Sequence, residues 1–305
     1  MNIAAATGGT VVLRKRPVSN ISSGRSVLKN FEDRTLSNLT LRILSACILV
    51  PAVLVLVWLG GWWFTALISI AGILVLREWN TITGVAQILF PLGSVVIVGA
   101  VILANLGHDW IAIAVIAIGS ICLWLIGTVR KENAVWVAAG LLYIGLPVIA
   151  VTMIRSSQAQ ALAAIIFVFA SIWITDSAAY ISGRSIGGPK LWPAISPNKT
   201  WAGLIGGMVG AAVFGFIFAQ LAGIPGAPWL ALLAAVLALV SQCGDLFESS
   251  VKRRFGVKDS GTIIPGHGGM MDRVDGMVAA ALFAAIIGIS RSGFDNVAAG
   301  LLDWR

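Results

Sequence analysis

About nine long apolar runs decide what this chain can fold into. A helix needs ~20 mostly apolar residues to cross the hydrocarbon core of a bilayer. The runs are continuous rather than alternating, which excludes a transmembrane β-barrel. We therefore predict an all-α integral membrane protein that crosses the bilayer about nine times. The predicted spans, of which the second and ninth are short, are 43–59, 62–76, 86–105, 110–128, 134–154, 160–181, 201–222, 228–247 and 276–290.

The composition supports this interpretation. Hydrophobic residues make up 58% of the 305 residues and charged residues only 11%, whereas soluble domains carry about 25% charged residues. The apolar surplus is too large for one soluble core and has to face lipid. The three cysteines, Cys47, Cys122 and Cys243, lie in apolar stretches without paired spacing, so neither a disulfide framework nor a zinc site is expected.

The positive charges predict the orientation. If the N-terminus lies in the cytoplasm, all but three of the 21 Lys and Arg residues fall on the cytoplasmic side, the exceptions being Arg155, Arg291 and Arg305. Short cytoplasmic loops of membrane proteins carry this excess of Lys and Arg. The asymmetry supports both the orientation and the number of spans. It also explains the net charge of +8 without a nucleic-acid partner.

Two parts of the chain differ in character. Residues 1–38 are polar and basic and lack the apolar core of a secretory signal, so we expect a mostly disordered cytoplasmic tail near anionic lipid. Residues 39–305 form one polytopic membrane domain without a visible internal repeat. The size of the chain and the lack of an organelle signal favour a bacterial inner membrane.

Polar residues concentrate in two long cytoplasmic segments, 182–200 and 248–275, and we expect the catalytic half at about 165–290. Just before the first segment, Asp176 lies inside the sixth span. An ionisable residue in a span is costly and is usually functional or paired. A functional Asp176 is therefore the favoured interpretation. The alternative is an interfacial Asp that pairs with a neighbouring lysine.

The first segment carries features of a phosphate-binding loop. Gly187 and Gly188 can bring backbone N–H groups close to a phosphate, and Arg184, Lys190 and Lys199 can neutralise its charge. The segment is not a Walker A loop, because the glycines that such a loop requires before Lys-Thr are missing. A loop that is merely basic and cytoplasmic would look similar.

The second segment is more specific. Asp245 and Glu248 stand three residues apart at the end of the eighth span, and Asp272 and Asp275 repeat this spacing before the ninth. Each pair shares a helix face. Carboxylates are hard ligands that hold Mg²⁺ together with substrate phosphates, and basic residues nearby balance the phosphate charge. The basic residues of this segment include Lys252, Arg253, Lys258 and Arg273.

A solvated loop with salt bridges is the alternative for this segment. It leaves unexplained why acids stand at two helix ends on the same side of the membrane. It also leaves unexplained the Gly-His-Gly-Gly run around His267, in a chain with only two histidines. The other histidine, His108, is expected on the surface of a short external loop. The pattern as a whole favours phosphoryl chemistry.

These residues resemble the signature of the phosphatidate cytidylyltransferases, also called CDP-diacylglycerol synthases. The resemblance covers about 165–290, while the N-terminal half is similar only in being a stack of membrane helices. The matching motifs are Asp176-Ser-Ala-Ala-Tyr180, Gly183-Arg184, Ser196-Pro-Asn-Lys-Thr200, Ser249-Ser-Val-Lys-Arg253, Lys258-Asp259 and Pro265-Gly-His-Gly-Gly-Met-Met-Asp-Arg-Val-Asp275.

The resemblance implies a reaction and its partners. CTP and phosphatidic acid would give CDP-diacylglycerol and pyrophosphate, with Mg²⁺ required and a second cation as an option. It also implies a homodimer and a site that opens to both cytosol and lipid. This agrees with the independent interpretation of the residues: acids for a metal, bases for phosphates, and a cytoplasmic site beside the membrane.

The phosphate of phosphatidic acid is already a nucleophile, so catalysis should rest on positioning and electrostatics. We predict Asp245 and Asp272 as the primary metal ligands, with Asp275 and Asp176 as further ligands or groups behind them. His267 would donate to the leaving pyrophosphate or brace its loop. The residues predicted to bind the two phosphate groups, not divided between them, are Arg184, Lys199, Lys252, Arg253, Lys258 and Arg273. Ser196 and Asn198 would hold a phosphate or the cytosine.

Other functions stay open at this stage. A CTP-dependent lipid-alcohol kinase or a CDP-archaeol-type synthase would also combine membrane helices with a nucleotide, although the complete motif argues against the kinase. A transporter should carry its acids near the bilayer midplane on broken helices in matched halves, whereas these acids stand at cytoplasmic helix ends. A structural scaffold would leave the motif unexplained.

Overall fold

The computed structural model describes residues 47–261, 263 and 268–304. Within these ranges eight helices are long and apolar enough to cross a membrane, and a shorter apolar helix, Cys47–Leu59, precedes them. The prediction of an all-α integral membrane protein is thereby confirmed. The long helices are α2 (Gly61–Thr83), α3 (Phe90–Asn105, extended by η1, Gln87–Leu89), α4 (Asp109–Val129), α5 (Ala134–Ser156), α6 (Ala161–Ser185), α7 (Trp201–Leu221), α8 (Ala227–Arg254) and α9 (Met271–Ser292).

The two spans that were predicted to be short are full-length helices. α2 has 23 residues and α9 has 22, against predicted ranges of 62–76 and 276–290. Both ranges were wrong because the polar ends of these helices are also helical. In α2 the end beyond the apolar run is buried, including Glu78 and Asn80. The beginning of the first span, like the predicted tail 1–38, lies outside the described residues.

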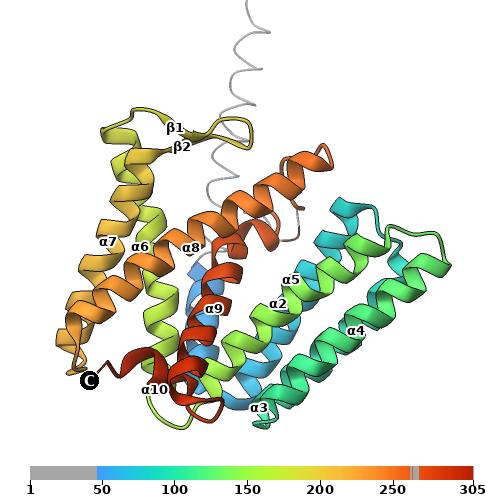
Figure 1. Ribbon diagram of the computed structural model, residues 1–305, viewed down its shortest axis with the longest axis horizontal. Coiled ribbons are helices and arrows are strands. Elements are labelled where there is room, and N and C mark those ends of the chain that lie inside the picture. Colours follow the sequence, from blue (N-terminus) through green and yellow to red (C-terminus); the bar gives the residue numbers. More distant parts are fainter. Residues whose placement is uncertain (1–46, 262, 264–267, 305) are drawn as a thin grey trace, which may run out of the picture.

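The helices form two groups with α9 between them. Helices α2 to α5 pack together, and α6, α7 and α8 pack together on the other side (Figure 1). α9 contacts both α5 and α8. A short helix, α10 (Val297–Leu302), packs against α9 and α6 and was not predicted. The first turn of α9, with Asp272, therefore lies between the two groups of helices.

Small residues bring the helices of the second group close together. Gly207 of α7 faces α6 so closely that an added Cβ would lie 3.1 Å from the Thr175 carbonyl oxygen. Helix pairs in a membrane gain little from the hydrophobic effect, and small residues stabilise them by allowing close packing. The close contact fixes α6, which carries Asp176, against α7.

A small hairpin occupies much of the first polar segment. Its strands are β1 (Lys190–Trp192) and β2 (Ser196–Thr200), which pair in antiparallel fashion. Thr200 ends the hairpin and caps α7, because its Oγ1 accepts a hydrogen bond of 3.0 Å from the Gly203 N–H. The hairpin, the end of α8 and the beginning of α9 lie toward the same end of the bundle (Figure 1). Both polar segments are therefore gathered on one face.

Candidate functional site

A cleft of about 760 Å³ lies among α6, the hairpin, α7 and α8. It joins residues that are far apart in the sequence. Gly187 and Gly188, with φ angles of 68° and 90°, form part of its wall and turn the backbone in a way that glycine tolerates. The predicted site residues that line it are Asp176, Arg184, Asn198, Lys199 and Asp245.

Charges of opposite sign meet in this cleft. Lys199 Nζ lies 2.5 Å from Asp245 Oδ2, and both side chains are largely shielded from solvent. Gln242 Nε2 donates a hydrogen bond of 3.2 Å to Asp176 Oδ1. Arg184 stands further out, where its Nη1 donates to the Tyr180 hydroxyl at 2.7 Å. The cleft thus presents basic side chains from α6 and the hairpin together with carboxylates from α6 and α8.

Three carboxylates meet where α8 and α9 approach each other. The nearest oxygens of Asp245, Glu248 and Asp275 all lie within 4.8 Å of one another. The approach is close because α8 has Gly244 there: an added Cβ would lie 3.0 Å from the Asp275 carbonyl oxygen. Glu248 is fully buried. Its Oε2 pairs with Lys252 Nζ at 2.7 Å, while its Oε1 is buried without a hydrogen-bond partner among the described residues.

This cluster fits a divalent cation. Carboxylates this close repel one another unless a positive charge lies between them. A buried carboxylate oxygen without a donor costs free energy that a metal ion would recover. Glu248 was not among the predicted ligands, although its spacing from Asp245 placed the two on one helix face. Asp245 and Asp275, both predicted, are brought together.

Asp272, predicted as a primary metal ligand, has other partners in the structure. Its Oδ1 accepts a hydrogen bond of 2.6 Å from Lys252 Nζ. Its Oδ2 accepts from the Ser260 N–H at 3.0 Å and from the Ser260 hydroxyl at 2.8 Å. Both oxygens are therefore engaged by the protein. Asp275, and not Asp272, joins Asp245 in the carboxylate cluster, and a metal-binding role for either residue stays a prediction.

Sequence reasoning missed Glu78 of α2, which is buried with 3% of its surface exposed. Its Oε1 accepts a hydrogen bond of 2.9 Å from the Met270 N–H, and its Oε2 accepts one of 2.7 Å from the Met271 N–H. The Ser260 hydroxyl also reaches Oε2, at 3.1 Å. Glu78 therefore satisfies the free N–H groups at the beginning of α9.

Glu78 also shapes the segment that carries the signature. An added Cβ at Gly261 would lie 2.8 Å from Glu78 Oε1, so the segment passes too close for a side chain there. Ser260 links Glu78 to Asp272, and Asp272 links to Lys252. The N-terminal helices are thus tied to the catalytic half through one buried polar chain.

Four further predicted residues that the structure describes do not line the cleft. Ser196 begins β2 and is half-buried, and Lys258 is exposed. Arg253 donates from Nη1 to the Val257 carbonyl at 2.9 Å. Arg273 is exposed on the first turn of α9. His267 lies outside the described residues. Roles in substrate binding for these residues stay predictions.

The helical membrane bundle thus carries a cleft with basic side chains beside a carboxylate cluster, an arrangement that suits phosphate-bearing substrates. Comparison with known proteins narrows the class. The cytidylyltransferase family matches residues 40–290, which extends the similarity into the N-terminal half. The chain therefore belongs to the cytidylyltransferase family, and it is a nucleotidyltransferase.

Individual relatives agree with the family. Proteins named phosphatidate cytidylyltransferase from Brucella suis biovar 1 (strain 1330) and Brucella melitensis biotype 1 are each 41% identical over 260 residues, which covers 83% of this chain and 94% of the relative. A protein of the same name from Bacillus subtilis (strain 168) is 41% identical over 175 residues, or 55% of this chain and 65% of the relative.

Proposed function

We propose that this protein is a phosphatidate cytidylyltransferase of phospholipid biosynthesis, which makes CDP-diacylglycerol and pyrophosphate from CTP and phosphatidic acid. The observation that carries the proposal is the meeting of a basic cleft and a carboxylate cluster at one face of a membrane bundle. The names of relatives that cover most of this chain support the same activity. Lys199 and Asp245, ion-paired at 2.5 Å, mark the point where cleft and cluster join.

Mg²⁺ is the proposed cation. Asp245, Glu248 and Asp275 would hold it, because hard oxygen ligands and substrate phosphates together suit this ion. When bound, it would neutralise charge on the phosphates of the reacting nucleotide. Asp176, in the same cleft as Asp245, is the candidate ligand for a second cation.

The residues of the chain position the reactants. In the reaction, an oxygen of the lipid phosphate forms a bond to the α-phosphorus of CTP. The bond from that phosphorus to the bridging oxygen breaks, and pyrophosphate leaves with the electron pair. The attacking oxygen is already ionised at neutral pH, so no strong base is needed. Catalysis then rests on alignment and charge balance.

The cleft supplies the groups for this alignment. Lys199 would bind the triphosphate through its compact ammonium charge, and Arg184 through the two-pronged hydrogen bonding of its guanidinium group. The backbone N–H groups around Gly187 and Gly188, where φ is positive, would donate hydrogen bonds to phosphate oxygens. Lys252 is held between Glu248 and Asp272, so it balances the acids behind the reacting phosphates.

The setting of the enzyme follows from the same proposal. The cleft would face the cytoplasm of a bacterial inner membrane, where CTP is available, and phosphatidic acid would arrive from the lipid. A homodimer is also proposed, on the family resemblance alone. The kinase and the transporter find no support in the comparisons.

The test uses the purified full-length protein in detergent with phosphatidic acid, CTP and Mg²⁺. CDP-diacylglycerol and pyrophosphate should form in equal amounts, and EDTA should abolish both. Formation of CDP and a newly phosphorylated lipid would overturn the proposal in favour of a kinase.

A further inference from the structure

An apolar groove begins directly beside the carboxylate cluster. It has a volume of about 450 Å³, lies between α5, α8 and α9, and is lined almost wholly by apolar side chains. Gly244 and Phe247, both in its wall, are the chain neighbours of Asp245 and Glu248. The groove and the cleft among α6, the hairpin, α7 and α8 therefore both reach α8 beside Asp245.

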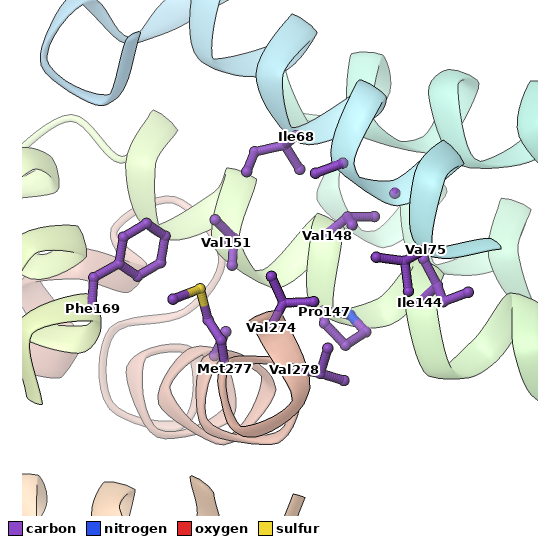
Figure 2. A pocket seen from close by; sticks show the side chains of 13 residues that line it. Ile68, Val75, Ile144, Pro147, Val148, Val151, Phe169, Val274, Met277 and Val278 are labelled. Atoms are coloured by element: carbon purple, nitrogen blue, oxygen red, sulfur yellow. The ribbon is translucent and has the colours of Figure 1, made fainter. Parts of the chain in front are cut away.

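A second apolar space shares part of the wall of the groove. A second apolar pocket, of about 80 Å³, lies between α2, α5 and α9, and Pro147 and Val278 line both spaces. Figure 2 shows this second pocket, with Phe169 of α6 at one end and Val75 and Ile144 at the other. The groove and the pocket therefore adjoin at Pro147 and Val278.

A polar group, the Tyr143 hydroxyl, belongs to a residue that lines the groove. The Tyr143 hydroxyl is buried and has no hydrogen-bond partner among the residues that the structure describes. The ring is held in place by Trp79, with centroids 5.0 Å apart, and by Phe247, at 5.4 Å. Four residues on, Pro147 has no N–H to offer the Tyr143 carbonyl. A buried hydroxyl without a partner costs free energy, so a ligand oxygen at this place would be stabilising.

We propose that one acyl chain of phosphatidic acid lies in the groove between α5, α8 and α9, and that the Tyr143 hydroxyl donates a hydrogen bond to a phosphate or ester oxygen of this lipid. The inference rests on the proposed function and adds to it where the lipid substrate binds. Lipid tails are as apolar as the groove, so the groove gains little from the hydrophobic effect. The groove contributes by its shape, because it would hold the acyl chain so that the lipid phosphate lies next to the carboxylate cluster.

The chain offers a matched pair of variants for the test. Cys243 is exposed in the wall of the groove, whereas Cys122 is an exposed cysteine on α4 and is not part of that wall. Cys243→Trp should fill the groove and raise the KM for long-chain phosphatidic acid about tenfold, with the KM for CTP unchanged. Dihexanoyl phosphatidic acid should be affected little, and Cys122→Trp should behave as the wild type. Equal effects of Cys243→Trp on long and short lipids, or no effect, would overturn the proposal.

A binding experiment separates this inference from the proposed function. In a variant with Cys47→Ser and Cys122→Ser, maleimide labelling of Cys243 should be slowed by long-chain phosphatidic acid. Phosphatidylcholine with the same chains should protect much less. Equal protection by both lipids would mean that the groove holds bulk lipid, which contradicts the proposal. A wild-type protein that forms no CDP-diacylglycerol would refute the enzyme activity, whatever the labelling shows.

Tyr143→Phe tests the hydrogen bond by removing only the hydroxyl. The KM for phosphatidic acid should rise about threefold to tenfold, while the KM for CTP and the thermal stability stay unchanged. Stability should not fall, because the hydroxyl has no protein partner to lose. An unchanged KM for phosphatidic acid would refute the role of Tyr143.

Discussion

Glu78 gives the sharpest prediction, because it belongs to neither polar segment and yet holds the beginning of α9. It accepts hydrogen bonds from the N–H groups of Met270 and Met271 and from the Ser260 hydroxyl. In Glu78→Ala these donors lose their acceptor inside the protein. In Glu78→Gln one amide oxygen stays, but the NH₂ group faces a donor.

The magnitude follows from the donors that are stranded. Each buried donor without an acceptor costs about 1–3 kcal/mol. Ser260 keeps Asp272 as a partner, so two N–H groups are lost in Glu78→Ala, and the cost is about 2–6 kcal/mol. In Glu78→Gln one N–H group loses its acceptor, at a cost of about 1–3 kcal/mol. Loss of the carboxylate charge at the beginning of α9 raises the cost by up to about 2 kcal/mol in both variants. The local segment should open before the bundle unfolds.

The assay is turnover combined with hydrogen exchange of the Met270 and Met271 amides. Turnover and amide protection should both fall in the order wild type, Glu78→Gln, Glu78→Ala. Glu132→Ala serves as a control, because Glu132 lies in the turn between α4 and α5. A Glu78→Ala protein with wild-type turnover and wild-type amide protection would refute this reasoning.

Three further predictions follow from the site and the packing. Asp275→Asn should raise the Mg²⁺ concentration that gives half-maximal activity. Asp272→Asn should lower kcat and leave this Mg²⁺ concentration unchanged, because Asp272 binds Lys252. The opposite pattern in a Mg²⁺ titration would restore Asp272 as the ligand. Lys199→Ala should raise the KM for CTP about tenfold or more, and an unchanged KM in steady-state kinetics would remove it from the triphosphate site. Gly207→Ala should destabilise the protein by about 1–3 kcal/mol through overpacking against α6, while Gly99→Ala, which meets open space, should not; equal melting temperatures in detergent would contradict the packing account.

Hydropathy predicted most of the fold, because continuous apolar runs leave few alternatives in a membrane. It failed at the ends of the second and ninth spans, where polar residues are helical because protein groups satisfy them. Glu78 is the clearest case. Its partners Met270 and Met271 lie almost two hundred residues away in the sequence, and local patterns do not encode a contact at that separation.

The sequence grouped the acids of the candidate site but did not determine which of them lie next to each other. Asp272 and Asp275 share a helix face, so spacing alone did not decide which of them meets Asp245. α8 and α9 run in opposite directions along their contact, so residues further along α8 meet residues earlier along α9. Asp275 therefore meets Asp245, while Asp272 meets Lys252. Only the packing of the two helices shows which of these residues meet, and which of the acids bind a metal stays a prediction.

The central claim is that the nucleotidyl group moves to the lipid, and the fate of labelled phosphate tests it most directly. The purified protein is given phosphatidic acid and CTP that carries the label either in the α-phosphate or in the γ-phosphate. We predict that the α-label appears in the lipid product and that the γ-label leaves as pyrophosphate. A lipid that carries the γ-label, with unlabelled CDP left in solution, would contradict the account and identify a kinase.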